Sequence, residues 1–276
     1  MRFVRKAVLV VAVIAVIFMA YRFLAIYEWR GGECRASHPA TFHNSYPKRL
    51  VVMTYNIEGH AALLRSDHIE RIAATIAKYH PDVVGLNEAH RNTWQSRFHD
   101  NVDQLRRLTH MNGAFGASYE FMNGAFGNAV LTRGTIRSAD VHKLPGTGEP
   151  RSLFDTVIDI DGGTIEMSVT HTTAWGSVNR ETRETQLKCI EQHIRASAWP
   201  HILTGDLNAP PDAPEIAAFL ASNPLQLANQ GQPTHKVTEK QLDYILADRG
   251  WRVASARVLD DGPSDHRPVL VELVHQ

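Results

Sequence analysis

The chain has 276 residues, of which 43% are hydrophobic and 21% charged, with 29 basic and 29 acidic side chains. This composition excludes a disordered chain and fits one sizeable globular domain with an appendage. Residues 46–276 hold 23 Lys or Arg and 27 Asp or Glu, a formal charge of about −4. The globular part therefore lacks the basic surface with which a protein binds nucleic acid by charge alone.

The N-terminus carries the pattern of a membrane anchor. Residues 7–27 form an apolar run of 21 residues interrupted only by Arg22, and a helix of that length rises about 32 Å, enough to cross a bilayer. Three basic residues lie within residues 1–6, so the positive-inside rule keeps that end in the cytoplasm and exports the rest. We expect a single-pass protein of the cytoplasmic membrane, with its globular domain on the extracytoplasmic side.

A cleaved signal peptide is the alternative, because the uninterrupted apolar stretch to Ala20 has the length of a signal-peptide core. No small-residue cleavage site follows it, which favours an uncleaved anchor. Residues 28–47, rich in Gly and Pro, are interpreted as a linker, and residues 48–276 as the domain. In an exported domain Cys34 and Cys189 can form a disulfide, although nothing in the sequence shows that they meet.

Strand and helix patterns alternate along the domain. The first helix, within 66–81, has Asp67 and Glu70 at capping-box spacing and is followed by a strand after Pro81. The turn Asp161-Gly162-Gly163 predicts a hairpin. We predict strands at 49–56, 82–88, 127–133, 152–160, 164–171, 201–206, 242–248, 251–259 and 267–274, and further helices near 100–110, 180–198 and 213–221.

Hairpins and crossover helices in this order favour an α/β fold with two packed sheets flanked by helices. The hexapeptide MNGAFG occurs twice, at 111–116 and 122–127. A spacing used once is too little for a repeat architecture, and we interpret the two copies as a coincidence in turn-rich sequence.

Polar residues stand where many of these apolar segments begin or end. In "HILTGDLNAPPD", Asp206 and Asn208 follow a buried strand and share a side if the backbone stays extended. An Asx turn explains one such pair, and each of the others has an equally ordinary explanation. Taken together they predict one site, made of Asn56, Glu88, His171, Asp206, Asn208, Asp243, Asp265 and His266.

The motifs TYNI, GDLN and SDHRP, in this order and spacing, resemble the endonuclease/exonuclease/phosphatase superfamily. The resemblance covers roughly residues 49–274. That superfamily includes DNase-like nucleases, abasic-site endonucleases, inositol polyphosphate phosphatases and neutral sphingomyelinases. It implies a four-layer α/β/β/α sandwich of two mixed sheets flanked by helices, and an enzyme that hydrolyses phosphoesters.

The resemblance also implies a cofactor and its ligands. Asn56 and Glu88 would hold a divalent cation, Mg²⁺ or Mn²⁺, and Asp265 would help to hold it. Mg²⁺ is a hard ion that takes few protein carboxylates and leaves room for phosphate oxygen and water.

The remaining roles implied by the resemblance concern the reacting phosphate. Asp206 would position the attacking water, Asn208 would bind a phosphoryl oxygen and His171 would donate to the phosphate. Asp243 would orient His266 and favour its imidazolium form. The motif leaves open whether Asp206 or His266 takes the proton from water, and we expect Asp206 to do so.

The family fixes the chemistry and leaves the substrate open. A lipid or small phosphodiester, such as a phospholipid or sphingomyelin-like head group, is favoured by the anchor, the acidic domain and the loop residue Trp175. An extracytoplasmic nuclease is the alternative, supported by arginines near predicted active-face loops. A catalytically idle binding module is the third alternative, and the intact set Glu88, Asp206, Asp243 and His266 argues against it. The arginines near the predicted active-face loops are Arg91, Arg97, Arg133, Arg151 and Arg180. We expect the protein to be a monomer.

Overall fold

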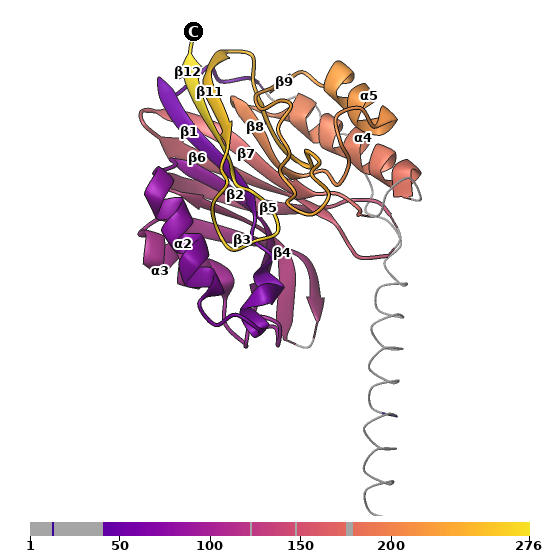
Figure 1. Ribbon diagram of the computed structural model, residues 1–276. Coiled ribbons are helices and arrows are strands. Elements are labelled where there is room, and N and C mark those ends of the chain that lie inside the picture. Colours follow the sequence, from indigo (N-terminus) through magenta and orange to yellow (C-terminus); the bar gives the residue numbers. More distant parts are fainter. Residues whose placement is uncertain (1–12, 14–40, 122, 147, 175–178) are drawn as a thin grey trace, which may run out of the picture.

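The computed structural model describes residue 13 and residues 41–276, except residues 122, 147 and 175–178. Within these residues twelve strands form two six-stranded mixed sheets, and two helices cover the outer face of each sheet (Figure 1). The predicted four-layer α/β/β/α sandwich is therefore confirmed.

The first sheet has the strand order β11-β12-β1-β2-β4-β3, and the second has the order β5-β6-β7-β8-β10-β9. Each sheet contains one parallel pair, β1 with β2 and β7 with β8. The strands are β1 (Arg49–Asn56), β2 (Val83–Arg91), β3 (Asn112–Phe121), β4 (Gly124–Thr132), β5 (Thr135–Lys143), β6 (Ser152–Ile160), β7 (Gly163–His171), β8 (His201–Asp206), β9 (Gln226–Leu227), β10 (Asp243–Ala247), β11 (Trp251–Val258) and β12 (Val269–His275).

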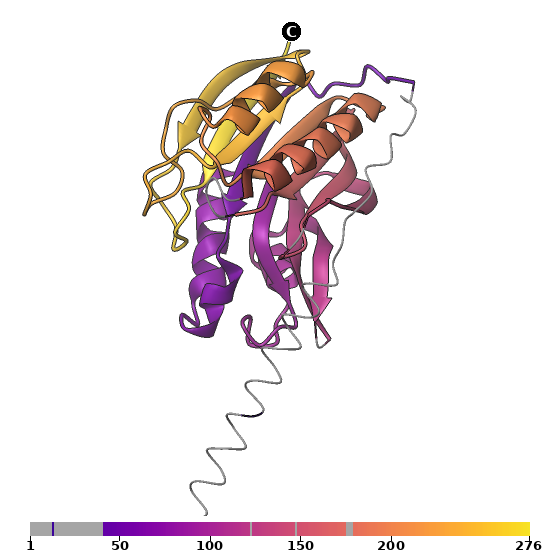
Figure 2. The same ribbon diagram turned by 90° about the vertical axis from the view of Figure 1, so that its right-hand side faces the viewer.

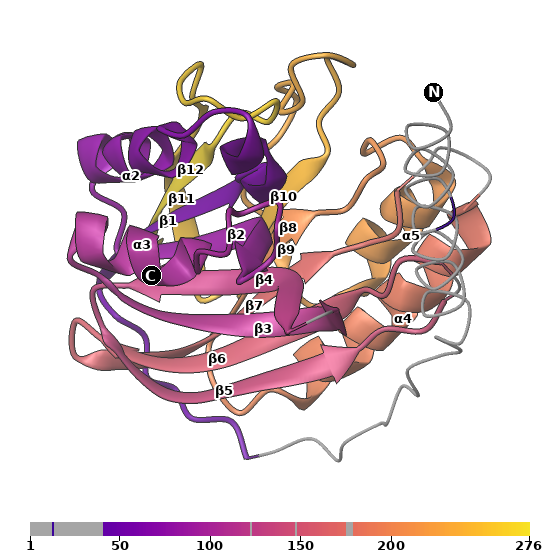
Figure 3. The same ribbon diagram turned by 90° about the horizontal axis from the view of Figure 1, so that it is seen from below.

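The helices segregate between the two outer faces. The first sheet is covered by α2 (His68–Tyr79) and α3 (Asn101–Thr109), and the second by α4 (Arg180–Ala196) and α5 (Pro214–Ser222). A short 3-10 helix, η1 (Gly59–Leu63), follows β1. Figures 2 and 3 show α2 on one side of the stacked sheets and α4 on the other.

Both faces of β1 are buried, and its alternation explains how the strand aims its last residue. Met53 and Tyr55 pack in the core beneath the helices, whereas Leu50 and Val52 pack in the core between the sheets. Successive strand side chains point to opposite faces. Asn56 therefore shares the face of Leu50 and Val52 and points toward the second sheet.

The interpretation of the MNGAFG copies as turn-rich sequence was wrong, because residues 112–116 lie in β3 and residues 124–127 lie in β4, and these strands pair directly. Their glycines permit this packing. A Cβ on Gly127 would stand 2.0 Å from the carbonyl oxygen of Gly116, and a Cβ on Gly116 would stand 2.3 Å from the Phe154 ring. The expected capping box of α2 is also absent, since Asp67 makes no side-chain capping hydrogen bond.

Among the described residues no helix is long and apolar enough to cross a membrane. The anchor predicted at 7–27 lies outside them except for residue 13, and the linker predicted at 28–47 is described only from residue 41. Cys189 on α4 is disulfide-bonded. Cys34, the other cysteine of the sequence, lies outside the described residues.

Candidate active site

The predicted site residues meet at one edge of both sheets. The parallel strands β1 and β2 carry Asn56 and Glu88 near their carboxyl ends, and β7 and β8 end at His171 and Asp206. The antiparallel strand β10 begins at Asp243, directly opposite Asp206. Because the carboxyl ends of parallel neighbours lie at the same sheet edge, the two stacked sheets bring their polar ends together.

Asp206 stands at the centre of this group and is 1% exposed. Its Oδ2 accepts a hydrogen bond from Asn56 Nδ2 at 3.2 Å. The same oxygen lies 3.6 Å from Nε2 of His171 and 3.6 Å from Nε2 of His266. One carboxylate oxygen therefore faces the amide and both histidines that the sequence placed in the site.

Glu88 reaches the site through an irregularity of β2. The pairing register with β4 shifts between Leu86 and Ala89, and Glu88 has a left-handed φ of 58°. Bulges and left-handed residues in strands are costly and cluster at functional sites. The result is that Glu88 Oε1 accepts from Asn56 Nδ2 at 3.1 Å, so one amide nitrogen bridges Glu88 and Asp206.

The protonation state of Glu88 follows from its neighbours. Burial raises the pKa of this carboxyl, but hydrogen bonds from His60 and Asn56 outweigh burial and hold the pKa well below its usual range. His60 lies on η1, with Nδ1 3.6 Å from Glu88 Oε2. Glu88 is therefore an ionised, preformed carboxylate, and His60 is a contact that the sequence patterns did not single out.

His266 and Asp243 form a buried charged pair. His266 Nδ1 lies 2.8 Å from Asp243 Oδ2, and Asp243 is fully buried. Burial lowers the pKa of His266, but the charges of Asp243 and Asp206 outweigh it and raise the pKa to about 10. His266 is therefore an imidazolium at neutral pH, which turns Nε2 into a donor facing Asp206.

His171 has the opposite character. Burial, aided by the charge of Arg151, holds its pKa well below the ordinary value, so this imidazole is neutral at pH 7. His171 and His266 thus face Asp206 in different protonation states, because only His266 has a buried carboxylate, that of Asp243, at its Nδ1. Such a division of pKa values is typical of acid-base sites.

Asp206 is itself shifted toward neutral pH. Burial raises its pKa to about 7, against the opposing charge of His266. Its Oδ1 accepts from the backbone N–H of Asn208 at 2.8 Å, and Asn208 has a left-handed φ of 54°. The Asn208 amide donates to the carbonyl of Thr172 at 2.9 Å. The Asx turn that the sequence offered as an ordinary explanation of this pair is therefore present.

Asn87 fixes the position of Asp206 from the other sheet. Its Oδ1 accepts the Asp206 N–H at 3.0 Å, while its Nδ2 donates to Thr170 O and to Asn128 Oδ1. Asn128 is 1% exposed and is held by Ser152 O. Asn128 is thus an internal link between the sheets.

Only some of the five arginines proposed for the active face lie there. Arg133 is at the opposite end of the first sheet, where Nε donates to Pro81 O just before β2 begins, so its predicted position was wrong. Arg91 pairs with Asp100, and Arg180 Nε lies 3.8 Å from Glu215.

Arg151 does reach the site. It is 6% exposed, and its charge acts on both Glu88 and His171. Within the described part of the chain, its Nε and Nη1 have no hydrogen-bond partner, and neither has His171 Nδ1. Buried donors without partners are costly. A phosphoryl oxygen is the kind of acceptor that would satisfy such donors.

Asp265 lies at the outer side of the site, with 43% of its side chain accessible. Its Oδ2 is 3.9 Å from Nε2 of His235, whose ring meets that of His266 edge-on at 4.7 Å. The neighbouring Ser264 hydroxyl donates to Asn56 O and accepts the His266 N–H. This contact ties the SDH motif to the end of β1.

The donor set fits a hard divalent cation. The carboxylates of Glu88 and Asp206 converge on the amide nitrogen of Asn56, and carboxylate oxygens are ligands that Mg²⁺ and Mn²⁺ prefer. Asp206, Asp243 and His266 have ligand atoms within 4.8 Å of one another, as do His235, Asp265 and His266.

A buried carboxylate centre beside unpartnered cationic and imidazole donors defines a site for phosphoester chemistry. Residues 53–266 match the model of the endonuclease/exonuclease/phosphatase family, and the chain belongs to this family. Its members are phosphoester hydrolases that generally depend on a divalent metal. No protein among curated sequences matches the chain.

Solved structures with this fold are similar over most of the chain. An endonuclease/exonuclease/phosphatase from Beutenbergia cavernae is 25% identical, with a TM-score of 0.69, covering 83% of this chain and 72% of its own. The human Nocturnin catalytic domain with bound sulfate is 22% identical (TM-score 0.66; 84% and 96% covered). A mannosyl-6-phosphatase of Bacteroides thetaiotaomicron is 20% identical (TM-score 0.65; 82% and 99% covered).

Proposed function

We propose that the chain is an Mg²⁺- or Mn²⁺-dependent phosphodiesterase that hydrolyses phospholipid or sphingomyelin-like head groups. One observation supports the proposal that the chain is a hydrolase. Asp206, whose pKa lies near 7, faces the imidazolium of His266, with Asp206 Oδ2 3.6 Å from His266 Nε2. A base near neutral pH and a fixed cation next to it suit activation of water and stabilisation of a phosphorane-like charge.

In the proposed reaction Asp206 accepts the proton of the attacking water, and the new P–O bond forms as the in-line P–O bond to the leaving oxygen breaks. The leaving alkoxide takes its proton from solvent. The Nε2–H of His266 and the donors of Arg151 and Asn208 bind the phosphoryl oxygens as their charge grows. A divalent cation held by Glu88 and Asn56, with help from Asp265, would supply Lewis-acid stabilisation of the same oxygens. The proton of the water ends on the Asp206 carboxylate.

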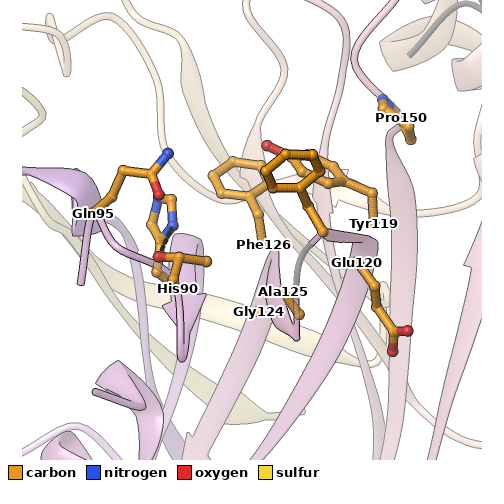
Figure 4. Close-up of a pocket in the computed structure, with 10 residues that line it drawn as sticks. His90, Gln95, Tyr119, Glu120, Gly124, Ala125, Phe126 and Pro150 are labelled. Atoms are coloured by element: carbon orange, nitrogen blue, oxygen red, sulfur yellow. Dashed lines mark hydrogen bonds between the residues drawn. The ribbon is translucent and has the colours of Figure 1, made fainter. Parts of the chain in front are cut away.

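The substrate preference rests on an aromatic pocket whose lining includes two sequence neighbours of site residues (Figure 4). Tyr119 and Phe126 form its wall with ring centroids 5.3 Å apart, and His90 meets Phe126 at 5.1 Å. His90 is two residues beyond Glu88, and Pro150 directly precedes Arg151. Aromatic rings around a small pocket bind quaternary ammonium groups through cation–π attraction, so a choline head group suits it.

Two further observations favour lipid over nucleic acid. The domain is acidic, and three of the arginines that supported a nuclease are engaged elsewhere: Arg91 with Asp100, Arg133 with Pro81 O and Arg97 with Leu63 O. Salt-dependent binding to a duplex requires cations free to meet phosphates.

The test is a substrate panel with the full chain in detergent and Mg²⁺: sphingomyelin, phosphatidylcholine, phosphatidylinositol phosphates, plasmid DNA and bis-(p-nitrophenyl) phosphate. Choline lipids should be preferred. Phe126→Leu removes the aromatic face, and should raise KM for choline lipids on the order of tenfold while leaving turnover of bis-(p-nitrophenyl) phosphate unchanged. Plasmid DNA as the best substrate of the wild type would overturn the lipid proposal. Loss of activity of Phe126→Leu on every substrate would overturn the proposal that the pocket recognises the choline group.

We also propose that the enzyme is a monomer tethered to the cytoplasmic membrane by residues 7–27, with the catalytic domain outside. A tether raises the effective concentration of the domain near lipid head groups. An alkaline phosphatase reporter fused to the C-terminus works only after export, so it should be active in the membrane fraction. An inactive reporter would place the domain inside the cell, and activity in the soluble fraction would indicate a cleaved signal peptide.

A further inference from the structure

A second cluster of metal-ligating side chains lies away from the active site. It consists of His142 on β5, Asp155 on β6 and His193 on α4, with ligand atoms all within 4.8 Å of one another. His142 Nε2 is 3.0 Å from Asp155 Oδ2, and the rings of His142 and His193 have centroids 4.1 Å apart.

The cluster faces away from the phosphoester site. Asp155 pairs in register with Ser168 on β7, three residues before His171. Because strand side chains alternate, Ser168 and His171 point to opposite faces of the second sheet. The cluster therefore lies on the outer face beneath α4, and none of its residues contributes to the reaction proposed above.

The surroundings of the cluster resemble those of a prepared metal site. Asp155 is 8% exposed, and its second oxygen accepts a hydrogen bond from the Ser168 hydroxyl, which in turn contacts His201 Nε2 at 2.8 Å. Carboxylate ligands of metals are typically fixed in this way by further hydrogen bonds. Both histidines are only half-buried, which leaves an entry path from solvent.

The distances are compatible with coordination. Ligand atoms of a tetrahedral Zn²⁺ at about 2.0–2.1 Å from the ion stand about 3.3 Å apart. The His142–Asp155 pair is already this close, and the ligand atom of His193 lies within 4.8 Å of both.

We propose that His142, Asp155 and His193 form a Zn²⁺ site that clips the edge strand β5 to helix α4. Two imidazoles and one carboxylate are a zinc-type donor set, with the fourth position left to water. β5 is at the edge of its sheet, and edge strands have one unpaired side that benefits from an added tether. The proposal is independent of the proposed phosphodiesterase function.

The experiment is zinc binding to the full chain, stripped of metal and then saturated with Mg²⁺. Equilibrium dialysis should find one Zn²⁺ per chain bound with low-micromolar or tighter affinity, and Zn²⁺ should raise Tm by a few degrees. Co²⁺ in place of Zn²⁺ should give the intense visible absorption of a tetrahedral site. All three signals should disappear in Asp155→Asn and in His193→Gln.

Two matched variants separate this site from the others. His99→Gln removes an exposed histidine outside the cluster, and Glu88→Gln alters the phosphoester site, so both should keep the zinc and cobalt signals. His193 is a half-buried helix residue, so His193→Gln tests the proposal even if Asp155→Asn fails to fold. Unchanged zinc binding in His193→Gln, or loss of the cobalt signal in Glu88→Gln, would overturn the proposal.

Discussion

Asp243→Asn tests whether a buried carboxylate keeps His266 charged. The variant retains an oxygen acceptor for His266 Nδ1 at the 2.8 Å contact and removes only the negative charge. The pKa of His266 is raised from an ordinary 6.5 to about 10, which at about 1.4 kcal/mol for each pH unit corresponds to about 5 kcal/mol in favour of the imidazolium. Asp243 is the strongest of the groups that oppose burial here.

An opposite charge at this distance changes a pKa by about 1–3 pH units, so the variant should bring the pKa of His266 down to near 8. At pH 6 both proteins then hold the imidazolium, and at pH 9 only the wild type does. We expect kcat/KM to fall on the order of a hundredfold at pH 6 through lost orientation of the ring, and roughly tenfold further at pH 9.

The assay is the pH profile of kcat/KM with bis-(p-nitrophenyl) phosphate, together with an NMR titration of the His266 ring. Asp265→Asn is the control for the titration, because Asp265 contacts His235 instead and contributes less to the pKa of His266. A loss of activity that is the same at pH 6 and pH 9, or an unchanged pKa of His266 in Asp243→Asn, would refute the reasoning.

Three further changes have defined outcomes. Excess EDTA should abolish turnover, and Mg²⁺ or Mn²⁺ should restore it; full activity after chelation would contradict the metal assignment. Glu88→Gln should raise the metal concentration needed for half-maximal rate without lowering Tm. Asp206→Asn should lower kcat on the order of a hundredfold or more with little change in thermal melting, and near wild-type kcat would misplace the base. Arg183 donates to Glu215 at 2.7 and 3.0 Å inside the protein. Because Arg183→Met leaves the Glu215 carboxylate buried without this partner, it should lower the free energy of unfolding, measured by urea titration, by about 3–5 kcal/mol. An unchanged urea midpoint would show that Glu215 finds another partner.

The sequence by itself determined most of the elements and the list of site residues. Strands such as β1 and β8 are apolar runs that end in a polar residue, and helix α2 has an apolar stripe at helical period, so local patterns suffice to find them. Asn56 and Asp206 stand at strand ends, and strand ends meet at a sheet edge. Their convergence therefore followed from the order of the elements, and the structure brings them within 3.2 Å.

Only the tertiary structure decided what depends on residues distant in sequence. In β3 and β4 the backbone of Gly116 and the ring of Phe154 occupy the space that side chains on Gly127 and Gly116 would need. These contacts are between residues distant in sequence, so a local pattern does not predict them. The sequence alone could not separate Arg151, at the site, from Arg133, at the far end of the sheet. It also could not separate the imidazolium of His266 from the neutral His171, because a pKa is set by burial and by charges brought close only when the two sheets pack.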